Sequence, residues 1–148
     1  MKKNSGFTLI ELLIVICIIG ILSTIILSSL SNSRAKAYDS KVKQQLNSFR
    51  TAAELYFTNQ DRYNEVQGVP ISECSTGMFN NFDAENSSPG LYIADGNLPD
   101  FSVVKCGSTD STYAVKATLY SGNEYWCVDN KGASRLIPGT PTSGTFCP

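Results

Sequence analysis

Residues 1–30 read MKKNSGFTLIELLIVICIIGILSTIILSSL, and this stretch decides how the chain is organised. A polar leader with two lysines ends at Gly6, and an apolar run extends from Phe7 to Leu30. At about 1.5 Å per residue, a helix over this run is about 36 Å long, which exceeds the hydrocarbon core of a bilayer at about 30 Å. The run therefore predicts a membrane-spanning helix.

Charges on either side of the run set the expected orientation. Lys2 and Lys3 favour a cytoplasmic N-terminus, because short basic flanks stay on the inner side of a membrane. Arg34, Lys36 and Lys41 lie on the far side and weaken this signal, but a large polar domain follows, and long domains cross largely regardless of charge. We expect the N-terminus inside and most of the chain outside.

Glu11 is the single charged residue of the apolar run. A carboxylate inside a membrane costs about 2.5–3.5 kcal/mol or more, so an acid at such a position indicates a functional site. The alternative is that Glu11 lies near the helix end and reaches the lipid headgroups. The residues around Glu11 favour the functional interpretation.

The hexapeptide Gly6–Glu11, GFTLIE, resembles the N-terminal signature of type IV pilins and type II secretion pseudopilins. The close resemblance covers residues 2–35, and a looser one continues to residue 64. It implies that a prepilin peptidase cleaves between Gly6 and Phe7 and methylates the new Phe7 amine. It also implies assembly, with Glu11 of one subunit facing the Phe7 ammonium of a neighbour.

This pairing would set the axial register of the subunits. Two opposite charges that are each costly in hydrocarbon are far less costly when they are paired. A subunit in the wrong register leaves both charges unpaired. We therefore expect Glu11 to act in assembly.

Two other interpretations of the N-terminal segment remain open. An ordinary signal peptide is cleaved after its apolar region, which here would give a mature N-terminus near Arg34. An uncleaved signal anchor would keep Met1. The N-terminal residue of the mature protein distinguishes both from cleavage before Phe7.

The chain divides into four expected segments: a cleaved leader (1–6), a transmembrane and filament-core helix (7–30), an amphipathic continuation of that helix (31–60) and a small disulfide-bonded β head (61–148). We expect one helix from Phe7 to about Asn59, since Gly20 is the one glycine and no proline interrupts it. Apolar residues recur at steps of three or four in the continuation: Ala35, Tyr38, Val42, Leu46, Phe49, Ala53 and Tyr56. This stripe needs a partner, and the strand-rich part that follows is the candidate.

The head shows a series of strand signals separated by turn residues. They cover Leu91–Ile93 (weak), Phe101–Val104, Thr112–Tyr120, Glu124–Asp129 and Ser134–Ile137, with turns at 121–123 and 130–132. In the third of these strands, Thr112–Tyr120, alternation places Val115 on the helix-facing side and Lys116 on the opposite face. Trp126, in the next strand, is expected in the core. The sequence predicts an α+β, pilin-like fold, in which the long N-terminal helix packs on an antiparallel meander of three or four strands.

Five cysteines divide between the two parts of the chain. Cys17 lies in the apolar run and is expected to be a small apolar side chain. The other four form an even set in a small exported domain, which predicts two disulfides, and four cysteines allow three pairings: Cys74, Cys106, Cys127 and Cys147. We favour Cys74–Cys106 and Cys127–Cys147, the second of which corresponds to the C-terminal disulfide loop that the resemblance implies. Buried thiols are the alternative, and the absence of a C-x-x-C spacing disfavours zinc.

The remaining chemistry points away from catalysis and cofactors. The chain has no histidine, a formal charge of −1 and no basic patch typical of nucleic-acid binding. No catalytic constellation is present, so we do not expect an enzyme. The turn Asp129–Gly132 could offer oxygen ligands to calcium, but one carboxylate and one amide are too few, and a plain hairpin turn is favoured. We expect no metal and no cofactor.

The resemblance implies a structural subunit of a type IV pilus or a related pseudopilus. The subunit would be stored in the inner membrane as a single-pass protein, with its N-terminus inside and its head outside. It would then polymerise with copies of itself and other pilins into a helical filament at the cell surface or in the periplasm. The implied partners are the prepilin peptidase and methylase, an inner-membrane assembly platform and membrane lipid. The alternative is a minor tip pilin that acts as an adhesion module.

The sequence is compatible with two conformations of the helix between Gly20 and Ser29 in the filament, helical or locally melted. Many members of the family carry a proline where this chain has Ser28, and their helix is often partly unwound there in the filament. Gly20 and the serines up to Ser29 are weak helix formers that could still permit local melting.

Overall fold

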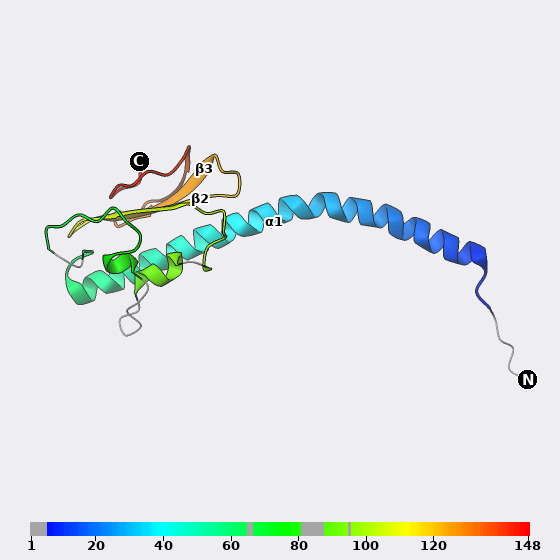
Figure 1. Ribbon diagram of the computed structural model, residues 1–148, viewed down its shortest axis with the longest axis horizontal. Coiled ribbons are helices and arrows are strands. Elements are labelled where there is room, and N and C mark those ends of the chain that lie inside the picture. Colours follow the sequence, from blue (N-terminus) through cyan, green and yellow to red (C-terminus); the bar gives the residue numbers. More distant parts are fainter. Residues whose placement is uncertain (1–5, 65–66, 81–87, 95) are drawn as a thin grey trace, which may run out of the picture. The chain divides into compact units, whose positions relative to one another are not determined.

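The computed structural model describes residues 6–64, 67–80, 88–94 and 96–148, and of residues 27–29 it describes the backbone alone. By its internal contacts the chain divides into two compact units, Met1–Ala35 and Lys36–Pro148. The elements, in chain order (Figure 1), are helix α1 (Leu9–Gln60), 3₁₀ helices η1 (Gly77–Phe79) and η2 (Pro89–Ile93), and strands β1 (Val104–Ser108), β2 (Tyr113–Thr118), β3 (Glu124–Asp129) and β4 (Ser134–Pro138).

Helix α1 is continuous over 52 residues, close to the expected range of Phe7 to Asn59. The stretch from Gly20 to Ser29 is α-helical in this single subunit. The helix ends where Asp61 takes a left-handed conformation with a φ of 57°. The Asp61 N–H then donates to the Phe57 carbonyl at 2.7 Å, which closes the last turn in the manner of a C-terminal cap.

The apolar stripe of α1 is buried from Val42 to Ala53, as its spacing predicted, and Tyr56 is half-buried. Val42, Leu46, Phe49 and Ala53 are fully buried in the main core of the head. Phe49 lies between two other rings, with its centroid 5.7 Å from that of Phe79 and 5.8 Å from that of Tyr113. In Figure 1 the sheet covers this part of the helix. Burial of the stripe therefore holds α1 to the sheet.

The sheet is a four-stranded antiparallel meander with the strand order β1-β2-β3-β4. Val115 of β2 pairs with Cys106 of β1 on one side and with Val128 of β3 on the other. The predicted α+β fold of a long helix on a small meander is confirmed. The limits of β3 agree with the prediction residue for residue.

Two strand predictions were wrong or displaced. Leu91–Ile93 belongs to η2, which begins at Pro89, a residue whose fixed φ and missing N–H suit the start of a helix rather than a ladder. Gly90 packs so closely on the Phe79 carbonyl that a Cβ would clash there. The strand expected at Phe101–Val104 begins only at Val104. The Val103 N–H donates to the Thr118 hydroxyl at 2.8 Å, and so it is not available to a strand ladder.

Strand β2 is buried on both faces. The alternation itself is as predicted, since Val115 lies in the core that contains the helix stripe and Ala114 lies in a second cluster with Cys127 and Cys147. Lys116 on this second face is only 4% exposed. The reason is the C-terminal tail, which packs over that face of the sheet.

Candidate functional site

The N-terminal residues of α1 form a capping box. Thr8 precedes the helix and Glu11 lies in its first turn. Glu11 Oε2 accepts the Thr8 backbone N–H at 2.9 Å and the Thr8 hydroxyl at 2.6 Å, while the Glu11 N–H donates to Thr8 Oγ1 at 3.4 Å. This reciprocal arrangement satisfies amides that have no partner within the helix, and it places a negative charge at the positive end of the helix dipole.

Sequence reasoning identified Glu11 but missed the role of Thr8. The pattern Thr8-x-x-Glu11 before an apolar run is the sequence signature of a capping box, so the signal was present. Among the described residues, both hydrogen bonds to the Glu11 side chain go to Oε2. Oε1 is therefore open to a further donor, such as an ammonium group.

Phe7 and the Gly6–Phe7 bond lie outside the helix. Neither residue has helical or strand structure, and the Phe7 side chain is 81% exposed. Among the described residues beyond the chain neighbours of Gly6, no heavy atom lies within 4 Å of the position that a Gly6 Cβ would take. The bond is thus accessible from solvent. Residues 1–5 of the predicted leader lie outside the described part of the chain.

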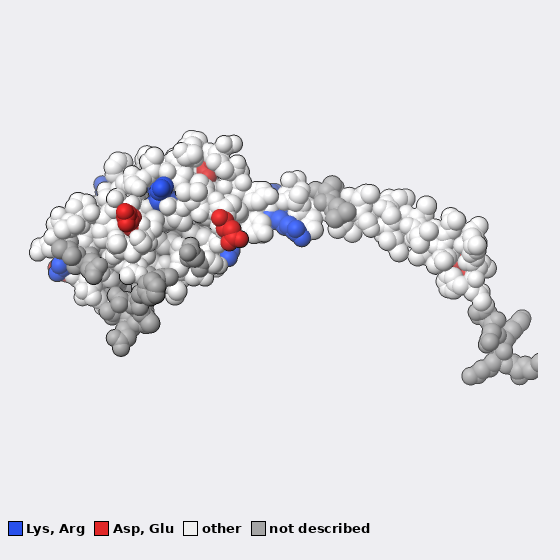
Figure 2. Space-filling view, in the orientation of Figure 1, with Lys and Arg blue, Asp and Glu red and all other residues white. Residues whose placement is uncertain are grey.

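The segment that follows presents an apolar surface in every direction. It is long and apolar enough to cross a membrane, and none of its apolar window is buried within the subunit. Figure 2 shows this half of α1 almost free of charged side chains. Two of its hydroxyls have local acceptors, since Ser23 donates to the Ile19 carbonyl at 2.7 Å and Thr24 to the Ile21 carbonyl at 2.8 Å. Such back-bonding lowers the cost of a hydroxyl in an apolar medium.

The four outer cysteines form two disulfides, Cys74–Cys106 and Cys127–Cys147, which are the pairings that the sequence analysis favoured. Cys106 lies in the core beneath the helix, and Cys147 lies in the second cluster on the other face of the sheet. Cys17 is free and exposed on the apolar helix. The two disulfides therefore staple different parts of the head, the first loop after α1 and the C-terminal tail.

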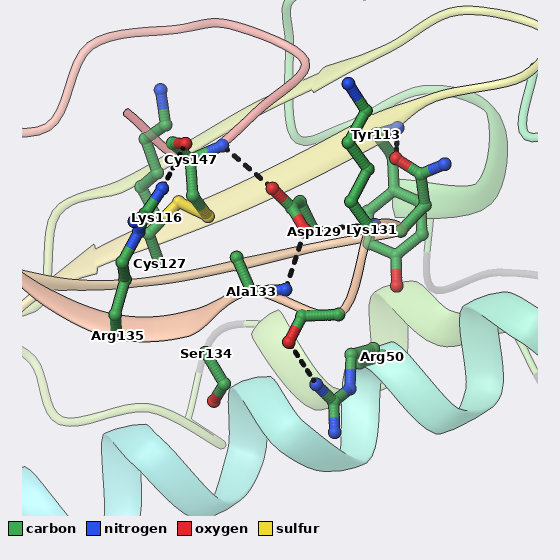
Figure 3. Close-up of a disulfide and its surroundings, with 12 residues drawn as sticks. Arg50, Tyr113, Lys116, Cys127, Asp129, Lys131, Ala133, Ser134, Arg135 and Cys147 are labelled. Atoms are coloured by element: carbon green, nitrogen blue, oxygen red, sulfur yellow. Dashed lines mark hydrogen bonds between the residues drawn. A yellow bond between two sulfur atoms is a disulfide. The ribbon is translucent and has the colours of Figure 1, made fainter.

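Three charged side chains hold the tail beside the second disulfide (Figure 3). Asp129 Oδ2 accepts the Cys147 N–H at 3.0 Å, and Arg135 donates to the Cys147 carbonyl at 2.8 Å. Lys116 Nζ donates to the Thr142 carbonyl at 3.0 Å, and burial lowers the pKa of this amine. A Cβ on Gly107 would lie 2.6 Å from the Gly144 carbonyl, so the tail backbone packs directly on β1.

The turn considered for calcium is organised as a hairpin turn. Asp129 Oδ1 accepts the N–H groups of Lys131 and Ala133 at 3.0 and 2.9 Å, so both carboxylate oxygens of Asp129 already have backbone donors. Within residues 6–64, 67–80, 88–94 and 96–148, no group of three or more His, Cys, Asp or Glu side chains could hold a metal ion. The Asp129 carboxylate acts as a structural acceptor here.

A capped apolar helix joined to a small disulfide-bonded sheet defines the class of pilin-like proteins. A family profile described as "Prokaryotic N-terminal methylation motif" matches residues 1–27. The type IV major fimbrial protein FimA of Dichelobacter nodosus is 47% identical over 117 residues, which cover 78% of this chain and 71% of that protein. The chain belongs to the family of type IV pilins and type II secretion pseudopilins.

Other relatives match shorter parts of the chain. The type IV major pilin protein PilA of Myxococcus xanthus is 41% identical over 63 residues, or 43% of this chain and 29% of that protein. The type II secretion system core protein G of Aeromonas hydrophila is 32% identical over 62 residues, or 42% of this chain and 43% of that protein. The chain thus spans less than half the length of these two relatives. Pilins and pseudopilins are structural rather than enzymatic proteins, as the sequence analysis expected.

Proposed function

We propose that the protein is a structural subunit of a type IV pilus or of a related secretion pseudopilus. The observation that carries this proposal is the capped Glu11 carboxylate at the start of an exposed apolar helix. Such a helix needs either lipid or other apolar helices around it, because exposing its surface to water is unfavourable. A helical bundle of identical subunits supplies that environment.

Processing prepares the helix for assembly. A prepilin peptidase cleaves the Gly6–Phe7 bond and methylates the new Phe7 amine. This step is supported by the match to the methylation motif over residues 1–27 and by the accessible, non-helical conformation at Phe7. Cleavage removes Lys2 and Lys3 and creates an ammonium group close to the capping box.

Assembly then pairs Glu11 of one subunit with the Phe7 ammonium of a neighbour. The capping box fixes the position of the carboxylate through Oε2, and Oε1 remains open for the incoming ammonium. Each charge is costly in an apolar bundle unless it is paired, so a subunit in the wrong register is disfavoured. The pair thereby selects the axial position of each new subunit.

Before assembly the subunit is stored in the inner membrane. Its N-terminus lies in the cytoplasm and the head lies outside, in line with the basic leader and the length of the apolar helix. An inner-membrane platform extracts it into a filament at the cell surface or in the periplasm. The four segments 1–6, 7–30, 31–60 and 61–148 serve as leader, membrane and filament-core helix, amphipathic continuation and head.

Two substitutions at one position test the pairing. Glu11→Gln keeps a side-chain oxygen that can accept the Thr8 N–H but removes the charge, whereas Glu11→Ala removes both. We expect both variants to be cleaved and inserted like the wild type, as intact-mass spectrometry will show, and both to give few sheared filaments. A normal filament yield from Glu11→Gln would refute the charge pair. A protein that is abundant in sheared wild-type filaments is a major subunit, and a scarce one is a minor tip subunit.

A further inference from the structure

Three aromatic side chains gather on the surface of the head unit. Tyr38 belongs to α1, Phe101 precedes β1, and Tyr120 follows β2. Their ring centroids are 5.7, 5.9 and 5.4 Å apart, yet the three residues are 43%, 37% and 54% exposed. Such packed aromatic groups are usually buried, and this aromatic patch (Tyr38, Phe101 and Tyr120) instead faces outward.

Hydrogen bonds fix the patch to the fold. Asp39 Oδ1 accepts the Tyr120 backbone N–H at 2.8 Å, which ties the end of β2 to α1. The Thr118 hydroxyl donates to the Phe101 carbonyl at 3.4 Å and accepts the Val103 N–H at 2.8 Å. The three rings are therefore presented by one rigid framework rather than by a loose loop.

Basic residues lie on both sides of Tyr38 in the sequence of α1. Arg34, Lys36 and Lys41 are exposed, and Asp39 is the one acid between Glu11 and Glu54 in the sequence. The Asp39 carboxylate is engaged by the Tyr120 N–H. Of the acids on other segments, Asp100 directly precedes Phe101, and the Glu124 carbonyl accepts the N–H of Leu119, the residue before Tyr120. An aromatic surface with a basic helical flank complements an anionic interface.

Tyr38, the helical member of the patch, lies close in the sequence to the apolar segment. Tyr38 follows Leu30 by eight residues, which is about 12 Å of helix. Helical side chains tilt toward the N-terminus, so the Tyr38 ring lies about one turn, or about 5 Å, nearer to Leu30 along the helix than its own Cα does. The polar headgroup layer is about 5–7 Å thick on each side of the hydrocarbon core. In the membrane-stored state proposed above, this spacing along the helix would bring the ring to the depth where tyrosines favour the membrane interface.

We propose that the aromatic patch and its basic flank dock on the outer headgroup layer of the bilayer in which the subunit is stored. The partner is an anionic phospholipid surface. This proposal rests on the membrane-stored state proposed above and adds a second contact between the head and the membrane. Leaving the membrane for the filament then requires that this contact be broken as well as the helix extracted.

Single-tryptophan proteins can test the docking. Trp126→Phe removes the native tryptophan, and a single tryptophan is then introduced into the full chain at one probe position at a time. Phe101→Trp reports the patch and Ile16→Trp reports the membrane span. Leu91→Trp is the matched control, because Leu91 is exposed and lines a pocket with Leu55, about 25 Å further along α1 than Tyr38. The proteins are reconstituted into phosphatidylcholine–phosphatidylglycerol vesicles that contain lipid brominated near the headgroup, for the probes at 101 and 91, or lipid brominated along the acyl chains, for the probe at 16.

We expect the brominated lipid to quench Phe101→Trp several-fold more than Leu91→Trp. Replacing Arg34, Lys36 and Lys41 by Glu, or omitting phosphatidylglycerol, should reduce this difference. If Phe101→Trp and Leu91→Trp are quenched equally while Ile16→Trp is quenched, the docking is overturned and membrane storage is not. An Ile16→Trp probe that is not quenched overturns both proposals. The measurement is repeated in vesicles that contain one protein copy each. If the quenching of Phe101→Trp changes on this dilution, the patch contacts a neighbouring copy, and the proposal is overturned.

Discussion

The buried carboxylate of Asp129 accepts the backbone N–H of Cys147 at 3.0 Å and so connects the β3–β4 turn to the end of the chain. Its other oxygen accepts the N–H groups of Lys131 and Ala133, which shapes the turn itself. One side chain thereby organises both the last hairpin and the C-terminal disulfide loop. The hairpin and the tail should respond together when Asp129 is changed.

Asp129→Asn should destabilise the head by about 1–3 kcal/mol, because an amide cannot accept on both sides and charge-assisted bonds are the stronger ones. The Asn NH₂ group would face at least one N–H donor of the turn or the tail. Chemical denaturation of the full chain in detergent measures the change. Asp100→Asn, at an exposed position, is the control and should leave the midpoint unchanged. Equal midpoints for Asp129→Asn and the control would contradict this role.

Removal of the second disulfide by Cys127→Ser and Cys147→Ser should cost about 3 kcal/mol, as expected for a loop closed across 20 residues. The tail would remain attached through Lys116 and Arg135, which bind its carbonyl groups. We therefore expect faster amide exchange in residues 139–148 and little change in the core around Phe49. Exchange that rises equally in both regions would show that the tail is required for the whole fold.

The helix stripe and β3 could be predicted because their signals are local. Val42, Leu46, Phe49 and Ala53 recur at helical spacing, and all four are buried. Lys116 could not be predicted in this way, because its burial depends on a tail that arrives 26 residues later. An alternating strand pattern reports which residues share a face, and it does not report what covers that face.

Short segments and polar contacts were the least predictable from sequence. Leu91–Ile93 is too short for its apolar residues to distinguish a strand from a 3₁₀ helix, and the preceding Pro89 decided the outcome. At the candidate site, the motif predicted an assembly role for Glu11, whereas the local bonds to Thr8 were missed although the sequence carries the capping-box pattern. The carboxylate therefore has a partner within its own subunit before any neighbour arrives.

Two buried tyrosines predict how the head responds to alkali. Tyr63 and Tyr113 both donate to Glu54, at 3.0 and 3.4 Å. Burial, followed by interactions with Glu54, raises the pKa of each phenol well above its usual value. Because the folded pKa is the higher one, stability is fully present below the unfolded pKa of about 10 and is lost as the pH rises above it.

A variant with Tyr63→Phe and Tyr113→Phe should therefore lose less stability than the wild type between neutral pH and pH values above about 10. Denaturation midpoints across this range provide the measurement. Burial lowers the pKa of Lys116, which acts in the opposite direction, but both proteins contain Lys116 and its effect cancels in the comparison. Parallel pH profiles for the two proteins would show that these phenols do not control the alkaline transition.

The capping box gives a prediction that separates positioning from charge. Thr8→Val removes the hydroxyl that donates to Glu11 and accepts from the Glu11 N–H, and it leaves the carboxylate and the backbone N–H at position 8 in place. The first turn should weaken by about 0.5–2 kcal/mol, as for the loss of other N-terminal caps. Amide exchange of the first turn, measured by NMR on the full chain in micelles, should become faster, and Thr8→Ser should restore it. Filament yield should fall less than in Glu11→Gln, because the charge is still present but is held less firmly. A yield as low as that of Glu11→Gln would mean that the position of the carboxylate matters as much as its charge.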